Sequence, residues 1–160
     1  EPQLIFTAHS IPEAMAANCE YADQLQEAAR LIAEALGTNN WRVVYQSRSG
    51  SPAQPWLAPD ITDYLRALND QGVKNVIVAP IGFVSDHMEV VYDLDYEAQN
   101  VAKELGMTMV RAATAGTHPV FVKMIRELML ERIDNAAPRF LGTRGPLPNV
   151  CPADCCLPGR

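Results

Sequence analysis

Two short stretches of this chain carry side chains that could move protons and hold a metal ion. The first contains His9, at the end of an apolar run, and the second contains Glu89. Further carboxylates follow Glu89 at four-residue intervals, at Asp93 and Glu97. A neutral imidazole at the rim of a cleft can accept a proton near neutral pH or bind a metal. Carboxylate oxygens suit hydrated divalent cations, so the two stretches together indicate chemistry that moves protons and a divalent metal.

Simpler explanations exist for both stretches. His9 alone could be a buried histidine bonded to backbone groups, although its place after a strand favours a functional role. The acids could be a solvated helix face, on which like charges four residues apart cost about 0.2–0.5 kcal/mol per pair. A four-residue step drifts by about 40° around an ordinary α-helix. A π-type turn would reduce this drift, and such turns often mark functional sites, but the residue pattern does not reveal one.

Four more side chains are candidates for contacts with a flat, anionic ligand, because arginine and aromatic rings can pair with it and stack on it. They are Ser47, Arg48, Trp56 and His87. For Trp56, anchoring of the proline-containing loop 51–59 is the better explanation. For His87 we favour a supporting role, either as a cap for the following helix or as a partner of Glu89.

Apolar runs and amphipathic stretches alternate along the chain and predict alternating strands and helices. Strands are expected at residues 4–7, 41–46, 75–79 and 107–111. Helices are expected at residues 21–36, 60–71, 87–105 and 117–135. This order predicts a doubly wound α/β fold, with a four-stranded parallel sheet and helices on both faces. Ligands of such sheets bind beyond the carboxyl ends of the strands, so we expect the candidate side chains to share one rim.

The composition predicts one globular α/β domain at residues 1–136 and an irregular, proline-rich tail at residues 137–160. The 160 residues include 48% hydrophobic and 20% charged side chains, as in ordinary soluble proteins. With a net charge of −6 and no basic run, nucleic acid is not expected as a partner. No apolar run approaches the roughly 20 residues that cross a bilayer. We expect a cytoplasmic segment of a longer protein, since neither Met nor a signal peptide precedes the first strand.

The cysteines suggest a second metal centre. Three of them crowd into the tail, and adjacent cysteines are poorly placed to bridge each other. In a reducing compartment, clustered thiols more often bind zinc or an iron–sulfur cluster, and the spacing does not choose between these. Both centres need four ligands, and the available thiols are Cys19, Cys151, Cys155 and Cys156.

Three motifs resemble the C-terminal half of the ferrochelatases, in order over most of the chain. They are residues 7–12 (TAHSIP), residues 45–48 with 56–60 (YQSR and WLAPD), and residues 82–97 (GFVSDHMEVVYDLDYE). The resemblance implies a lyase of heme biosynthesis that inserts ferrous iron, its substrate, into a porphyrin. It also implies a second α/β half, absent here, with the macrocycle between the halves. Three tail cysteines plus one after the histidine motif resemble the actinobacterial type, which implies a [2Fe–2S] cluster and coproporphyrin III as substrate.

By position in these motifs, His9 corresponds to the catalytic histidine that faces the porphyrin centre. Glu89 corresponds to an opposing carboxylate, which we expect to face the ring from the other side. Asp93 and Glu97 correspond to acids that lead metal in or protons out, on a helix with a π-type stretch. All four are thus expected to handle the metal.

Two alternatives remain open. One is a cobalt or nickel chelatase of another tetrapyrrole, although such relatives usually lack the SDHME sequence found at 85–89. The other is a non-catalytic domain that binds a tetrapyrrole or an iron–sulfur cluster. A hydrolase built on His9 and Ser10 is disfavoured, because no Gly-x-Ser-x-Gly nucleophile elbow occurs.

Overall fold

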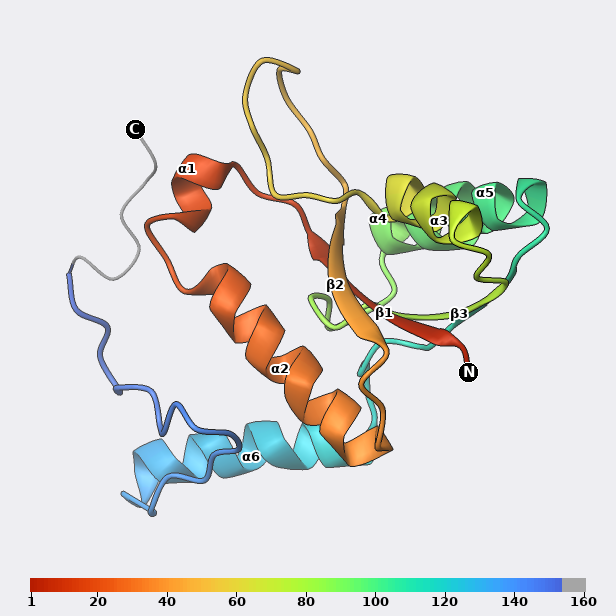
Figure 1. Ribbon diagram of the computed structural model, residues 1–160. Helices are drawn as coiled ribbons and strands as arrows, with labels where there is room; N and C mark the ends of the chain where they lie inside the picture. The colour runs from red at the N-terminus through yellow and green to blue at the C-terminus, as the bar shows by residue number, and fades with distance from the viewer. Residues whose placement is uncertain (154–160) are drawn as a thin grey trace.

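The computed structural model describes residues 1–153, which form a four-stranded sheet with helices on both faces (Figure 1). Neighbouring strands are all parallel, in the order β2-β1-β3-β4. The strands are β1 (Gln3–His9), β2 (Trp41–Gln46), β3 (Asn75–Ala79) and β4 (Thr108–Arg111). The helices are α1 (Glu13–Ala16), α2 (Tyr21–Leu36), α3 (Ile61–Asp70), α4 (Met88–Val90), η1 (Val91–Ala98), α5 (Gln99–Glu104) and α6 (Pro119–Ile133). The predicted parallel α/β architecture is confirmed.

Side chains of the central strand β1 alternate between two hydrophobic cores, as the two-residue period of a strand requires. Ile5 belongs to the core beneath α3, η1 and α5, whereas Phe6 belongs to the core beneath α2, and both are fully buried. The first core also contains Val44, Leu65, Val78, Val90 and Leu94. The second also contains Ala8, Leu25, Ala29, Val43 and Tyr45. Packing on both faces therefore fixes β1, which carries His9 at its end.

Strand β1 extends two residues beyond the predicted end at Thr7. Its ladder with β2 continues through Ala8, opposite Tyr45, to His9, opposite Gln46. His9 is therefore the last residue of a hydrogen-bonded strand and does not belong to the loop that follows. A side chain on a rigid element is held more closely in place than one on a loop.

Local signals set the ends of two helices as the sequence predicts. Asp60 caps α3, because its Oδ1 accepts a hydrogen bond from the Thr62 backbone N–H at 2.8 Å. Gly37 ends α2 in the left-handed conformation, with φ 69°. The short helix α1 was not predicted, since four residues are too few to show a helical period.

The predicted helix at 87–105 is one continuous helical segment with a π-helix, η1, in its middle. This agrees with the π-type stretch that the resemblance implied. In a π-helix the hydrogen bonds skip an extra residue, so each turn contains more residues than in an α-helix. Val90, Leu94 and Ala98 are fully buried. Val91 is exposed, because a residue one position from Val90 points to another side of the helix.

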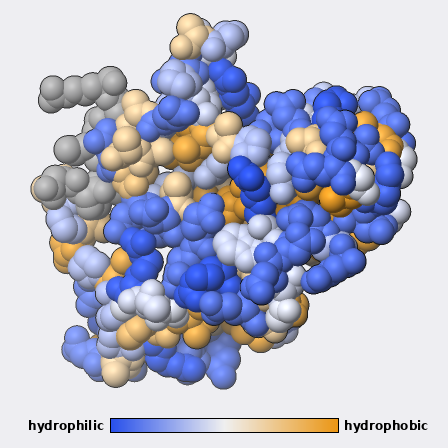
Figure 2. Space-filling view, in the orientation of Figure 1, coloured by the Kyte–Doolittle hydropathy of each residue, from blue (hydrophilic) through white to orange (hydrophobic). Residues whose placement is uncertain are grey.

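Helix α6 lies away from α3 and α5 (Figure 1) and has no buried residue. It ends at Ile133, two residues before the predicted end. Hydrophobic side chains reach the surface around α6, at the bottom of Figure 2. The described part of the tail, up to residue 153, contains no helix or strand. Within residues 1–153, every helix is too short or too polar to cross a membrane.

Candidate active site

His9 and Glu89 meet at the carboxyl edge of the sheet. His9 ends β1, and Glu89 lies in α4, which follows the loop after β3. The Nε2 atom of His9 is 2.9 Å from Oε1 of Glu89, and both side chains are partly open to solvent, at 37% and 45%. The sequence analysis expected the two groups on opposite sides of a ring. That expectation is wrong, because a contact of 2.9 Å leaves no room for a ring between them.

The other ring nitrogen of His9 defines the protonation of the pair. Nδ1 lies 2.5 Å from the backbone carbonyl oxygen of Ser10. A carbonyl can only accept a hydrogen bond, so the network assigns a proton to Nδ1. Nε2 therefore faces the Glu89 carboxylate, and the contact between them requires one shared proton. The pair is partly open to solvent.

The helix that carries Glu89 is tied to the far edge of the sheet by Arg111, at the end of β4. Its guanidinium contacts Asp86 at 2.9 Å, just before α4, and Asp95 at 2.5 Å, within η1. The hydrogen bond that Arg111 donates to Asp95 is the main reason that the pKa of Arg111 lies above its ordinary value, so Arg111 stays charged. These contacts attach the residues before α4 and the middle of η1 to the end of β4.

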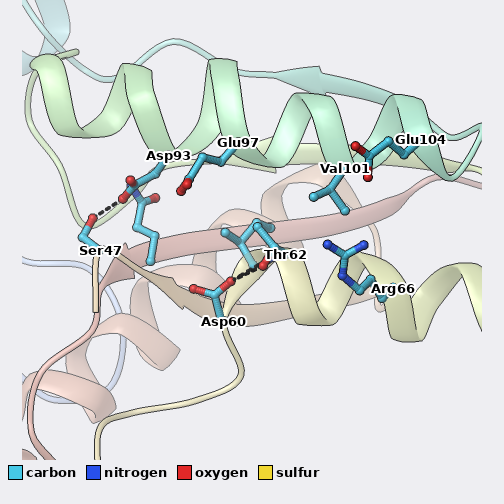
Figure 3. Close-up of a pocket in the computed structure, with 10 residues that line it drawn as sticks. Ser47, Asp60, Thr62, Arg66, Asp93, Glu97, Val101 and Glu104 are labelled. Atoms are coloured by element: carbon cyan, nitrogen blue, oxygen red, sulfur yellow. Dashed lines mark hydrogen bonds between the residues drawn. The ribbon is translucent and has the colours of Figure 1, made fainter. Parts of the chain in front are cut away.

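Asp93 and Glu97 point into a separate hollow of about 440 Å³ between η1 and α3 (Figure 3). Asp93 accepts hydrogen bonds from Gln46 Nε2, at 3.2 Å, and from the Ser47 hydroxyl. The other charged residues that line this acidic hollow are Asp60, Arg66 and Glu104. The Ser47 hydroxyl thus contacts Asp93, and its contact with a ligand stays a prediction.

The four predicted metal-handling residues do not form one centre. Glu89 turns toward His9, whereas Asp93 and Glu97 face the acidic hollow. Among residues 1–153, no three His, Cys, Asp or Glu side chains lie close enough together to hold a metal ion. Gln46 connects the two places, because it is the ladder neighbour of His9 and donates to Asp93. Gln46 is almost fully buried, and its Oε1 has no partner in the described chain.

An apolar patch beside Glu89 was missed in the sequence analysis. Met88, Tyr92 and Tyr96 are 82%, 52% and 59% exposed, and they line a shallow hollow of about 280 Å³. The two tyrosine rings stack at 5.5 Å. The charge of Glu97, more than burial, raises the pKa of Tyr92 above its ordinary value, so its hydroxyl stays neutral. The signal was present, since residues 88, 92 and 96 repeat at four-residue spacing one position before the acids.

The remaining ligand-contact candidates also make contacts within the chain, and their contacts with a ligand stay predictions. Arg48 donates to the carbonyls of Pro52 and Gln54, at 3.3 and 3.1 Å, and thus braces its own loop. Trp56 pairs with Pro12 through a backbone bridge, as expected of a loop anchor. The ring of His87 packs edge-on against Phe83, with centroids 5.4 Å apart. His87 occupies the N-cap position of α4, as predicted, but in the described chain its side chain forms no capping hydrogen bond and no contact with Glu89, which pairs with His9.

Two of the four cysteines lie in the described residues. Cys19 is partly buried and Cys151 is exposed, and both are free thiols. Cys155 and Cys156 lie outside the described residues. Arg144 in the tail pairs with Glu20, the residue next to Cys19, at 2.6 Å. Cys19 and Cys151 are donors of the right type for an iron–sulfur cluster, which stays a prediction.

Comparisons with known proteins show which family the sequence matches. Residues 1–133 match the family model described as Ferrochelatase. A ferrochelatase from Rhodopirellula baltica is 52% identical over 97% of this chain and 45% of its own length. A coproporphyrin III ferrochelatase from Nocardia farcinica is 47% identical over 99% of this chain and 49% of its own length. The chain thus spans about half the length of the curated relatives it matches.

A solved structure gives independent support for the fold. The putative cobalamin (vitamin B12) biosynthesis CbiX protein from Marinobacter aquaeolei superposes with a TM-score of 0.61 at 18% identity. The match covers 85% of this chain and the whole of that one. At this identity the likeness concerns the fold and carries no argument about the substrate.

Proposed function

The chain belongs to the ferrochelatase family, and we propose that it forms one wall of a site where ferrous iron enters a porphyrin in heme biosynthesis. The single observation that carries the proposal is the contact between His9 and Glu89 at the open edge of the sheet. It stands between an acidic hollow and an exposed apolar patch. The acidic hollow suits a hydrated cation, and the apolar patch suits a flat apolar ring.

Insertion of Fe²⁺ requires two pyrrole N–H protons to leave, so that charge is conserved at the ring. Because Nδ1 of His9 is committed to the Ser10 carbonyl, only Nε2 can accept such a proton. The bridging proton first leaves through the partly exposed Glu89 carboxylate, and Nε2 is then free to accept a pyrrole proton. After the first pyrrole proton has left the pair through Glu89, Nε2 of His9 can accept the second, which leaves by the same route.

Asp93 and Glu97 would attract the incoming Fe²⁺ toward the site. Carboxylate oxygens bind hydrated divalent cations weakly enough to release them when only one or two take part. Since no three metal-binding side chains converge in residues 1–153, the hollow suits passage of the ion better than storage. Gln46 donates to Asp93 and is the ladder neighbour of His9, so it would direct the ion from the hollow toward His9.

For the substrate we propose coproporphyrin III. Support comes from relatives of that name at 41–47% identity over more than nine-tenths of this chain. The exposed Tyr92 and Tyr96 rings beside Glu89 are flat surfaces on which a macrocycle could rest. Equal turnover of protoporphyrin IX and coproporphyrin III by the full-length enzyme would refute this preference.

The other half of the full-length protein is the proposed partner that completes the site. Only one wall of a cleft is present here, and the relatives are about twice as long as this chain. Helix α6, which has no buried residue and exposes several hydrophobic side chains, is a surface that could pack against that half. We expect the 160-residue chain alone to lack turnover and the full-length protein to have it.

A [2Fe–2S] cluster on the four cysteines is the proposed cofactor. It rests on the number and type of thiols, together with the pair that Arg144 in the tail forms with Glu20, the residue next to Cys19. The cluster would supply no step of the insertion. Substituting Cys155→Ser should remove its visible absorbance, and an unchanged spectrum with iron retained would exclude Cys155 as a ligand.

The test of the proposed function is His9→Asn in the full-length enzyme, with His118→Asn as control. His118 lies at the start of α6 and outside the site. Loss of a general base costs about 10²–10⁴-fold in rate, so we expect metalloporphyrin formation, followed by absorbance, to fall by at least about 100-fold. The control should keep its rate. Turnover within about threefold of wild type in His9→Asn would refute the proposal.

A further inference from the structure

Tyr21, at the first position of α2, is linked to the end of β1. Its hydroxyl donates a hydrogen bond to the backbone carbonyl of His9 at 2.8 Å, although the two residues are 12 positions apart. The Tyr21 ring packs against the core beneath α2. A buried phenol hydroxyl usually finds a hydrogen-bond partner. The partner of the Tyr21 hydroxyl is the peptide group that follows the candidate catalytic histidine.

That peptide joins His9 to Ser10, and both its carbonyl oxygen and its N–H form hydrogen bonds. Its oxygen accepts from Tyr21, and its N–H donates to the Gln46 carbonyl at 2.8 Å. The Ser10 hydroxyl donates to the carbonyl of Leu57, also at 2.8 Å. The next carbonyl along, that of Ser10, accepts from Nδ1 of His9. The direction of the imidazole therefore depends on the orientation of this short backbone segment.

Resting on the proposed function of His9, we propose that Tyr21 is a positioning residue, which orients the His9–Ser10 peptide so that Nε2 points at Glu89. Of the four contacts on this segment, only the one from Tyr21 comes from α2, across residues 10–20, which include α1. The others come from β2, from the loop before α3 and from His9 itself. Tyr21 is thus the link between α2 and the catalytic side chain.

The donor role of Tyr21 is available at all working pH values. Burial, with a smaller effect of Tyr45 and Cys19, raises the pKa of Tyr21 above its ordinary value. The hydroxyl therefore keeps its proton near neutral pH and can donate continuously to the His9 carbonyl. A phenylalanine at this position keeps the ring and its packing but removes the donor.

The proposal is tested with Tyr21→Phe, and Tyr64→Phe is the matched control. Tyr64 is a partly buried tyrosine of α3 whose ring lies under Arg42, away from His9. Ring-nitrogen NMR signals of the three histidines would be recorded on the chain labelled with ¹⁵N-histidine, with the His9 signal assigned from His9→Asn. We expect Tyr21→Phe to move the His9 signals and leave those of His87 and His118 in place. The control should move none of them.

Kinetics of the full-length enzyme provide the second readout. Misplacement of a catalytic group lowers kcat more than substrate binding, so Tyr21→Phe should lower kcat about tenfold with the porphyrin KM unchanged. An unmoved His9 signal would overturn the proposal. Equal movement of the signals of all three histidines, or the same effect from Tyr64→Phe, would also overturn the proposal, because either result indicates a general loosening of the structure. If Tyr21→Phe moves the His9 signal while His9→Asn keeps full turnover, the proposed function fails and the positioning role stands.

Discussion

Gly82 is in closer contact with the end of β1 than any other glycine in the described chain. A Cβ atom at this position would lie 2.5 Å from Cβ and 2.7 Å from Cα of Ala8. Ala8 is fully buried and precedes His9, so it cannot move aside. The Gly82 N–H also donates to the Thr7 carbonyl at 3.0 Å. Overpacking of this kind costs about 1–3 kcal/mol, and here two atoms of an immobile residue are involved. We therefore expect Gly82→Ala to lose about 2–3 kcal/mol.

Either β1 or the segment that leads to Glu89 must shift to accept the added methyl group, and both carry half of the His9–Glu89 pair. For a domain of this size each kcal/mol lowers Tm by roughly 2–4 °C, so thermal unfolding should shift by about 4–12 °C. The insertion rate of the full-length enzyme should fall at a temperature where the variant is still folded.

Gly106→Ala is the control for backbone strain. A Cβ at Gly106 meets no atom within 4 Å, but φ is 65°, a left-handed conformation that costs a non-glycine residue about 1–2 kcal/mol. It should lower Tm less than Gly82→Ala and leave the insertion rate unchanged. A Tm for Gly82→Ala within 1 °C or so of wild type, by the scale above, together with a normal rate, would refute the close packing of Gly82 on Ala8.

Two further predictions concern charge. Glu27 has its pKa lowered to about 2, chiefly by its hydrogen bond from Arg30 and also by one from the Thr143 N–H. Because this folded-state pKa lies below the unfolded value of about 4.3, the contribution of Glu27 to stability is present above pH 4.3 or so and is lost toward pH 2. Urea unfolding of Glu27→Gln should therefore differ from wild type near pH 6 and converge with it near pH 2, and a constant difference would contradict the assignment. Asp93→Asn should raise the Fe²⁺ KM several-fold with the porphyrin KM unchanged, since it removes a charge from the acidic hollow, and a reversed pattern would place Asp93 at the porphyrin.

The strand–helix order could be predicted because its signals are local. Asp60 and Gly37 mark helix ends by their own chemistry, and apolar runs such as 75–79 reveal buried strands. The position of His9 at the carboxyl edge of the sheet could be predicted for the same reason, because His9 lies at the end of an apolar run. The continuation of β1 to His9 was not predicted, because it depends on the distant partner Gln46.

The fine geometry of the site depends on contacts that no local pattern encodes. The 2.9 Å contact of Glu89 with His9 follows from the path of the loop after β3, which Gly82 and Arg111 hold from two sides. Sequence reasoning instead placed Glu89 across a ring. Likewise the π-helix η1 came from the family resemblance alone, since periodicity cannot separate it from an α-helix. The hydrogen bonds of Arg48 to carbonyls of its own loop could not be predicted from the sequence either.

The central claim is that His9 and Glu89 act as one proton-handling pair at the face of a porphyrin. The most direct test is a crystal structure of the full-length protein with a bound porphyrin. We expect Nε2 of His9 to face the ring centre, with Glu89 beside it on the same side of the macrocycle. A porphyrin bound away from this edge of the sheet, or one lying between the two side chains, would contradict the account.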